Sequence, residues 1–222
     1  MLDLTLLPAY LVAVTLVTIA PGPDAAYIVA VAVERGPRAG LLSATGMALG
    51  MAVHVTAAAL GLAVLLQSTP LALMALELAG GLYLGGLAVS TLRALRTLRT
   101  LRTLPTARKP LARAAATPPD RDILRRAVVT NLLNPKTVLF FAAFLPRFTN
   151  PDRGALWPQL LTLGLIFLVV GLVWDSAIGL CAGRLGQGLL RGPTAATAVN
   201  VAAGLTFATL AGLLLKDVVT AL

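Results

Sequence analysis

The chain has 222 residues, of which 58% are hydrophobic and 12% charged, and 18 Lys and Arg against 9 Asp and Glu give a formal net charge of +9. The mean hydropathy is +0.87, whereas soluble domains carry about 45–50% apolar and about 25% charged residues. So few charges cannot cover a water-facing surface, which excludes soluble globular, disordered and collagen-like proteins. We therefore expect a polytopic membrane protein.

The first apolar stretch, residues 4–33, is too long for one straight crossing of the bilayer and is interrupted by Pro21-Gly22-Pro23. We expect a broken or strongly tilted helix there. A crossing takes about 20 apolar residues. The chain then forms a single all-α membrane domain over residues 1–222, with six transmembrane helices (spans 1 to 6). The expected spans are 4–33, 41–66, 71–92, 127–146, 156–182 and 195–215.

The distribution of Lys and Arg over the loops predicts the orientation. Fourteen lie in the loops after spans 1, 3 and 5, and three lie in the opposite loops and at the C-terminal end. Because positive residues accumulate in cytoplasmic loops, we expect these three loops in the cytoplasm and both termini outside. Met1-Leu2-Asp3 lacks the positive charge with which a removable signal peptide begins, so we expect no such peptide.

A basic loop at 93–122 separates spans 3 and 4, and it opens with Arg at every third position from Arg93 to Arg102. This pattern predicts an interfacial helix whose arginines face anionic lipid headgroups. A regulatory or partner-binding arm is the alternative. Nucleic-acid binding is not expected, since it would need a basic face on a soluble fold.

Few ionisable residues fall within the spans: Asp24, His54, Glu77, Lys136 and Asp175. Charges in the membrane are expensive and are functional-site candidates by default. Asp24 directly follows Pro21-Gly22-Pro23 in span 1, and Lys136 ends Asn134-Pro135-Lys136 in span 4. Unwound backbone at this depth is tolerated only where protein buries it or where it lines a wet cavity.

The two breaks lie in the first span of each three-span half. A repeat of three spans would have inverted topology, and matching interrupted helices indicate the central site of a transporter. No residue-level similarity links the halves, so two inverted three-helix halves with broken helices 1 and 4 stay a hypothesis. The alternative is that the prolines only kink the helices while Asp24 and Lys136 neutralise each other.

The residue types at the breaks suit a small zwitterion. Asp24 would hold a substrate ammonium group or a proton, and Lys136 would bind a carboxylate when loaded and Asp24 when empty. Asn131 and Asn134 would add polar contacts. The residues expected to hold the broken helices open are Pro21, Gly22, Pro23 and Pro135.

The other ionisable residues allow two interpretations each. His54 lies on one helical face with Gly46 and Gly50, and it either packs against a carbonyl or relays protons. Asp175 is either a second coupling carboxylate or, as we favour, an interfacial residue within reach of Arg184. Glu77 lies at the mouth of the pathway or reaches toward the membrane surface.

Four segments carry a family resemblance: APGPD (20–24) with the following ERGPRAG, GMALGMAVHVTAAALGLAVLL (46–66), LAGGLYLGGLAV (78–89) and NLLNPKTVLFFAAFLPRF (131–148). In these segments the chain resembles the LysE/RhtB family of bacterial amino-acid exporters. The resemblance implies an inner-membrane efflux carrier for amino acids or close derivatives, driven by the proton-motive force. It also implies that the two breaks line the translocation pathway. The long basic loop and Glu77 depart from the pattern.

Three other functions stay open at this point. An exporter of a metal cation is one, although a single His54 and a single Cys181 make a zinc site improbable. A non-transport membrane subunit is the second. A membrane enzyme is the least favoured, because Ser43 and His54 lie about 16 Å of helix rise apart. We expect no enzyme activity, no cofactor and no bound metal, and a homo-oligomer stays open.

Overall fold

The computed structural model describes residues 2–62 and 119–189, together with the isolated helical positions 78, 82, 85, 86, 89, 208 and 212. Every regular element in this part of the chain is helical. The elements are α1 (Leu7–Ile19), α2 (Pro23–Arg35), α3 (Pro37–Ala57), the π-helix η1 (Ala58–Leu62), α6 (Asp120–Leu132), α7 (Pro135–Leu139), the π-helix η2 (Phe140–Phe144), the 3₁₀ turns η3 (Leu145–Phe148) and η4 (Pro151–Arg153), and α8 (Leu156–Leu189). Expected spans 3 and 6, Glu77 and nearly all of the basic loop lie outside the described residues.

Four of the expected spans have a counterpart in the described ranges. The stretches Pro37–Gly61 and Leu156–Leu185 are each long and apolar enough to cross a membrane. Two further candidates are bent pairs, α1 with α2 at 50° and Asp120–Leu132 with Pro135–Phe148 at 45°. These bends confirm that both expected breaks are real. The count of six and the inverted repeat are not tested by these residues.

The first break follows from local backbone chemistry. Proline disfavours a helical conformation in the residue before it, and Ala20 before Pro21 is extended, with ψ 123°. Gly22 is also extended, with φ −148° and ψ −177°. Pro23 then occupies the first turn of α2, where its missing N–H removes no hydrogen bond. The sequence Pro21-Gly22-Pro23 therefore ends one helix and starts the next.

The second break has its own cap. The Asn134 side chain accepts a hydrogen bond from the Lys136 backbone N–H at 3.1 Å, and Pro135 begins α7. The preceding helix α6 starts at Asp120, within the expected basic loop, because acidic residues favour the first turn of a helix. Asp120 and Asp122 occupy that turn.

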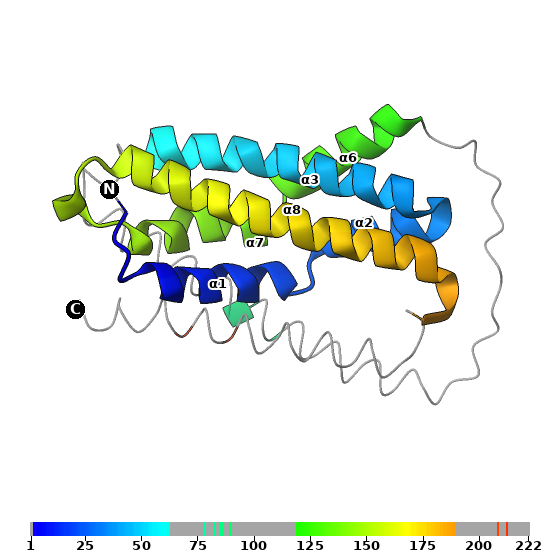
Figure 1. The fold of residues 1–222 in the computed structure, drawn as a ribbon, viewed down its shortest axis with the longest axis horizontal. Helices are drawn as coiled ribbons and strands as arrows, with labels where there is room; N and C mark the ends of the chain where they lie inside the picture. The colour runs from blue at the N-terminus through cyan, green and yellow to red at the C-terminus, as the bar shows by residue number, and fades with distance from the viewer. Residues whose placement is uncertain are drawn as a thin grey trace.

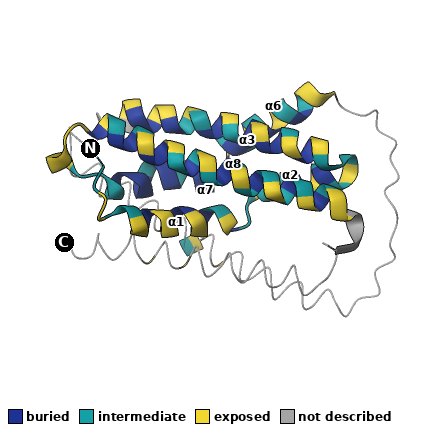
Figure 2. Cartoon of the chain, viewed as in Figure 1, coloured by how far each residue is buried: buried dark blue, intermediate teal, exposed yellow. Residues whose placement is uncertain are grey.

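Figure 1 shows α3 and α8 side by side along the long axis of the molecule. α3 packs most extensively on α8 and on α6, and α2 packs on α8 and α3. Figure 2 shows that the buried residues of these helices face one another, while exposed residues follow their outer sides. Many of the exposed residues on α1, α3 and α8 are large and apolar, including Leu11, Val53 and Val173. This distribution suits helices surrounded by lipid.

Glycines set the separation between α3 and α8. A Cβ atom on Gly40 would lie 2.7 Å from the Gly179 carbonyl oxygen, so the two backbones are in direct contact. One helical turn further, Gly183 lies against the backbone of Pro37. Small residues four apart permit such close approach in a membrane. The contact fixes which face of α8 is turned toward the interior.

A second glycine contact joins α3 to α6. A Cβ on Gly46 would lie 2.6 Å from the Ala127 Cβ, and one on Gly50 would lie 2.9 Å from the Asn131 Cβ. His54 is the next member of this four-residue series on α3. The contact therefore places His54 and Asn131, one from each helix, at the same seam.

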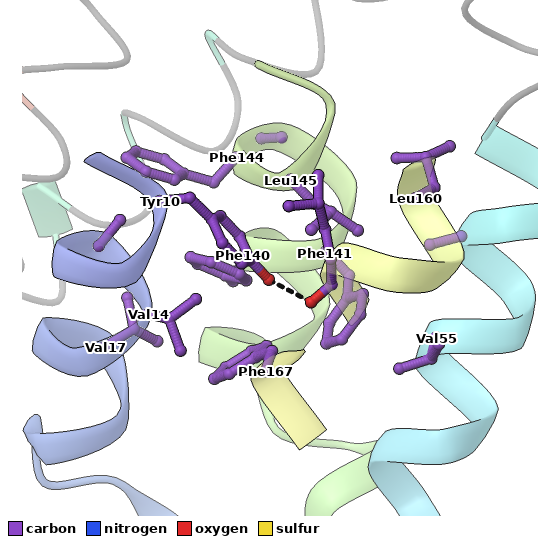
Figure 3. Packing of buried hydrophobic residues seen from close by; sticks show 14 of the residues in the cluster. Tyr10, Val14, Val17, Val55, Phe140, Phe141, Phe144, Leu145, Leu160 and Phe167 are labelled. Carbon is purple, nitrogen blue, oxygen red and sulfur yellow. Dashed lines mark hydrogen bonds between the residues drawn. The ribbon is translucent and has the colours of Figure 1, made fainter. Parts of the chain in front are cut away.

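Aromatic side chains fill the interior on the far side of the breaks. Figure 3 shows Tyr10, Val14 and Val17 of α1 facing Phe140 of η2 and Phe167 of α8. The Tyr10 hydroxyl donates a hydrogen bond to the Leu163 carbonyl, which satisfies the phenol in an otherwise apolar cluster. This cluster ties the first half-helix of span 1 to α8 and to the second half of span 4.

The loops gather at two opposite ends. Arg38 pairs with Asp120 at 3.4 Å, and Gly183 lies against Pro37, so the arginine-bearing segments around these residues meet at one end. At the other end the Asn150 side-chain amide donates to Asp3 at 2.8 Å. Hydrogen bonds from Thr5 and Asn150 lower the pKa of Asp3 to about 2. Stability from this lowered pKa is present above the ordinary value of 3.8 and is lost as the pH falls toward 2.

The Gly40–Gly179 contact predicts the effect of one methyl group. Gly40→Ala should lower the melting temperature of the purified protein in detergent, because an overpacked helix interface typically costs about 1–3 kcal/mol. The matched control is Gly86→Ala, since a Cβ at this helical position meets no atom of the described residues within 4 Å. There alanine should leave the melting temperature unchanged or raise it, because it is the better helix former. Equal melting temperatures for Gly40→Ala and the wild type would contradict the contact.

Candidate functional site

Lys136, from the second break, lies inside the first break. Its Nζ is 3.5 Å from Asp24 Oδ2, and the two side chains are only 6% and 11% exposed. The same Nζ donates a hydrogen bond to the Ala20 carbonyl at 3.0 Å. Ala20 ends α1 and Asp24 lies in the first turn of α2. One ammonium group therefore binds both ends of the interrupted helix, where a helix C-terminus itself favours a cation.

Gly22 lies directly against this ion pair. A Cβ at position 22 would lie 2.6 Å from Asp24 Oδ1 and 3.2 Å from Lys136 Nζ. The backbone there is extended, a conformation open to any residue, so the restriction comes from the neighbouring charges. Sequence reasoning assigned Gly22 only to the opening of the helix and missed this contact.

Several buried polar atoms beside the pair have no hydrogen-bond partner among the residues that the structure describes. Asp24 Oδ1, both amide atoms of Asn131 and Asn134 Nδ2 are in this state. Asn131 and Asn134 are 0% and 1% exposed. An unsatisfied buried polar group typically costs about 1–3 kcal/mol, and such groups are uncommon in folded proteins. Their concentration at the two breaks indicates a place that takes a polar ligand or water.

Thr18 adds a hydroxyl that the sequence analysis did not select. Its Oγ1 is also buried and without a partner within the described ranges. Thr18 lies two residues before Ala20, whose carbonyl binds Lys136. Thr18 could have been selected from the sequence, because it is a polar residue just before the Pro21-Gly22-Pro23 break.

His54 packs against the second break. Its Nε2 lies 3.3 Å from the Asn131 carbonyl oxygen, and its ring stacks on Phe141 with centroids 5.8 Å apart. The geometry agrees with the interpretation of a packed histidine that contacts a carbonyl. The contact also joins His54 to the segment that carries Asn131, Asn134 and Lys136, so a proton relay stays a proposal.

Asp175 lies in the interior of the bundle. Asp175 is buried, at 9% exposure, and it interacts electrostatically with Asp24 and Lys136. Arg184, by contrast, is exposed. Asp175 follows Gly171 and precedes Gly179 at four-residue steps on α8, and these glycines contact Met51 and Gly40 of α3. The small residues at these four-residue steps therefore turn Asp175 toward the interior of the bundle, and the interfacial and coupling interpretations of its role both stay predictions.

The structure thus gathers most of the expected site residues. Asp24, Lys136 and Asp175 form one charged cluster from α2, α7 and α8. Asn131 and Asn134 flank the second break, and the prolines at positions 21, 23 and 135 start or end the half-helices. The cluster offers carboxylates, an ammonium group and unpaired amides in one place. These groups are complementary to a molecule that carries both an ammonium and a carboxylate group.

Comparison with known proteins identifies the family of this chain. The profile of the family described as LysE type translocator matches residues 15–217. The homoserine/homoserine lactone efflux protein of Salmonella typhimurium is 31% identical over 206 residues, 93% of this chain and 94% of that protein. An uncharacterized membrane protein of Vibrio cholerae is 29% identical over the same shares of both chains.

The leucine efflux protein of Enterobacter sp. is 30% identical over 141 residues, 64% of this chain and 62% of that protein. No solved structure gives a significant match. The family match covers both breaks and confirms the resemblance that the sequence motifs carry. The chain belongs to the family of LysE type translocators.

Proposed function

We propose that this protein is a bacterial inner-membrane secondary transporter that exports amino acids or close derivatives and is driven by the proton-motive force. The observation that carries the proposal is the buried Asp24–Lys136 ion pair at the junction of two broken helices. A charge pair that only stabilised the bundle would not need unpaired amides beside it. A binding site for a small zwitterion does need them.

Two of the relatives suggest the class of substrate. One is named for homoserine and homoserine lactone and another for leucine, and none of these compounds carries a charged side chain. Asp24 and Lys136 can pair with the α-ammonium and α-carboxylate groups of an amino acid. This pairing needs no charge on the substrate side chain. We therefore propose a small amino acid with an uncharged side chain as substrate.

The ion pair supplies a mechanism of partner exchange. In the empty site Lys136 is bound to Asp24, and in the loaded site the substrate carboxylate takes Lys136 while the substrate ammonium takes Asp24. Each buried charge then keeps an opposite charge, which matters because an unpaired ion in a low dielectric is strongly unfavourable. The empty site is therefore stable without a ligand, and binding replaces one pair by two.

The polar atoms around the pair would orient the substrate. Amide donors of Asn131 and Asn134 lie on the second break, and the first turn of α2 presents the positive end of its helix dipole. Both suit a carboxylate. His54, through its contact with the Asn131 carbonyl, would extend this polar route along α3.

The two ends of the bundle suggest the orientation. Arg38 and Arg121 are highly exposed at the end where the loops after spans 1 and 5 meet. Because Lys and Arg accumulate in cytoplasmic loops, we propose that this end is cytoplasmic. The N-terminus and the hydrogen bond between Asn150 and Asp3 would then lie outside. We propose the C-terminus outside as well, and anionic lipid headgroups as partners of the basic loop.

A transport assay tests the function directly. Proteoliposomes preloaded with a mixed pool of labelled amino acids are given a pH gradient, and the loss of each compound is followed. The expected result is selective, gradient-dependent release of small amino acids with uncharged side chains. Release of no amino acid by protein shown to be folded would refute the proposal, and a panel of metal cations would then be tested in the same vesicles.

Removing one charge of the pair predicts a loss of transport. Asp24→Asn should reduce export at least 100-fold, because the substrate ammonium loses its counter-ion and Lys136 loses its partner. Lys136→Gln should be similarly impaired. The double variant removes both charges and avoids a lone buried ion, so it should be more stable than either single variant yet still inactive. Recovered export in the double variant would show that the two residues only neutralise each other.

The size restriction at position 22 predicts a separate effect. Gly22→Ala keeps every charge but places a methyl group against Asp24 and Lys136. We expect the affinity for substrate to fall by an order of magnitude or more, together with a lower melting temperature. Gly61→Ala is the control, since among the residues that the structure describes a Cβ there meets no atom within 4 Å. Wild-type export kinetics in Gly22→Ala would contradict the tight fit around the pair.

A further inference from the structure

We propose that Asp175 is the proton-carrying group of the exporter, while Asp24 and Lys136 bind the substrate. This inference rests on the proposed function. It assigns proton transport to one carboxylate, Asp175, and binding of the substrate ammonium to the other, Asp24. Sequence position alone favoured a surface role for Asp175, so the assignment depends on where α8 places this side chain.

The first support is the position of Asp175 within a seam of small residues. Gly171, Gly179 and Gly183 share its helical face and contact Met51, Gly40 and Pro37, respectively. The glycines bring the α8 backbone close to α3, and Asp175 is the only ionisable residue on this face of α8 within the described range. A carboxyl group in such a closely packed seam is held in place and shielded from lipid.

The second support is the lack of a partner. In the part of the chain that the structure describes, Asp175 has neither an ion pair within 4 Å nor a hydrogen bond from its side chain. Yet it is buried beside Asp24 and Lys136. The Asp175 oxygens are not among the fully buried, unpartnered side-chain atoms of the described residues, so the carboxyl group keeps some accessible surface through which a proton can reach it.

The third support is the balance of charge. Asp24 and Lys136 already cancel at 3.5 Å. Ionised Asp175 leaves this cluster with one excess negative charge in a medium of low dielectric. A proton on Asp175 restores neutrality, whereas a zwitterionic substrate adds no net charge. Ionised Asp175 instead competes with Asp24 for Lys136, which leaves Asp24 available to the substrate ammonium, and protonated Asp175 does not compete. Protonation of Asp175 and binding of the substrate therefore disfavour each other, which is the condition for exchange.

The other titratable groups on the neighbouring helices face elsewhere. On α3, His54 contacts the Asn131 carbonyl and Phe141. On α1, the Tyr10 hydroxyl is bound to the Leu163 carbonyl. On α2, Tyr27 donates to the Ile123 carbonyl at 3.0 Å. Of the described groups, Asp24 and Lys136 are thus the two whose charges act on Asp175.

The exchange proceeds by loss and gain of one proton. When the proton leaves the Asp175 carboxyl for cytoplasmic water, the carboxylate attracts Lys136, whose ammonium has three N–H donors. The hold of Lys136 on Asp24 weakens, and Asp24 accepts the substrate ammonium. On the outer side a proton binds Asp175, Lys136 returns to Asp24, and the ammonium is released. One proton enters for each substrate that leaves.

The decisive experiment compares two activities in the same proteoliposomes. Exchange of labelled for unlabelled substrate at equal pH needs only the substrate site, whereas uphill accumulation under a pH gradient also needs the proton site. For Asp175→Asn we expect the ratio of accumulation to exchange to fall at least 10-fold, with loss of the internal pH change that substrate causes in the wild type. Asp175→Glu should restore both. Asp152→Asn, in an exposed loop, is the matched control.

Three outcomes are told apart by this design. A structural role for Asp175 would lower accumulation and exchange in the same proportion, and an unchanged ratio in Asp175→Asn would overturn the proposal. Asp24→Asn should instead lose exchange itself. Failure of the proposed function appears separately, as a wild-type protein that exchanges no amino acid.

A second measurement uses the wild type and does not depend on the folding of a variant. Dicyclohexylcarbodiimide reacts with protonated carboxyl groups in apolar surroundings. Mass spectrometry should find Asp175 modified, with less modification as the pH rises or when the transported substrate is present. Absence of modification at Asp175, or modification independent of pH and substrate, would overturn the assignment.

Discussion

The contact of Lys136 with the interrupted first span organises the described part of the molecule. Its ammonium group binds the Ala20 carbonyl, where α1 ends, and the Asp24 carboxylate, where α2 begins. Pro21-Gly22-Pro23 removes the helical hydrogen bonds that would otherwise satisfy this backbone. The second break presents Lys136 at that place, with its backbone fixed by the Asn134 cap. Each helix break alone would leave polar groups without partners in the membrane. The Lys136 side chain of the second break binds free polar groups of the first.

This arrangement is not the most stable way to fill a bundle. Replacing a buried ion pair by packed apolar residues is often neutral or stabilising, and the unpaired amides of Asn131 and Asn134 add a further cost. The surrounding structure offsets that cost with dense packing: an aromatic cluster around Tyr10 and Phe140 on one side and backbone contacts at Gly40 and Gly179 on the other. Close packing around a polar centre is what a site for a small charged ligand requires.

The glycine contacts also determine the electrostatics. They bring α8 close enough to α2 and α3 for Asp175 to act on Asp24 and Lys136. Without this approach the cluster would be a neutral pair with no reason to exchange a cation. With it, two carboxylates and one ammonium group share a volume of low dielectric, so the occupancy of one cation affects that of another. The close packing of small residues is therefore what allows these charges to interact.

Residue pattern alone predicts the membrane class, the places of four spans, both helix breaks and the family, because hydropathy, proline and glycine act locally. It also selected Asp24, Lys136, Asn131 and Asn134, because polar residues stand out in apolar stretches. Three further facts came from the tertiary structure: Lys136 binds across the first break, Gly22 lies against the ion pair, and Asp175 lies inside the bundle. These facts depend on how α7 and α8 pack against α2, and contacts between residues more than 100 positions apart leave no periodic signal in a single sequence.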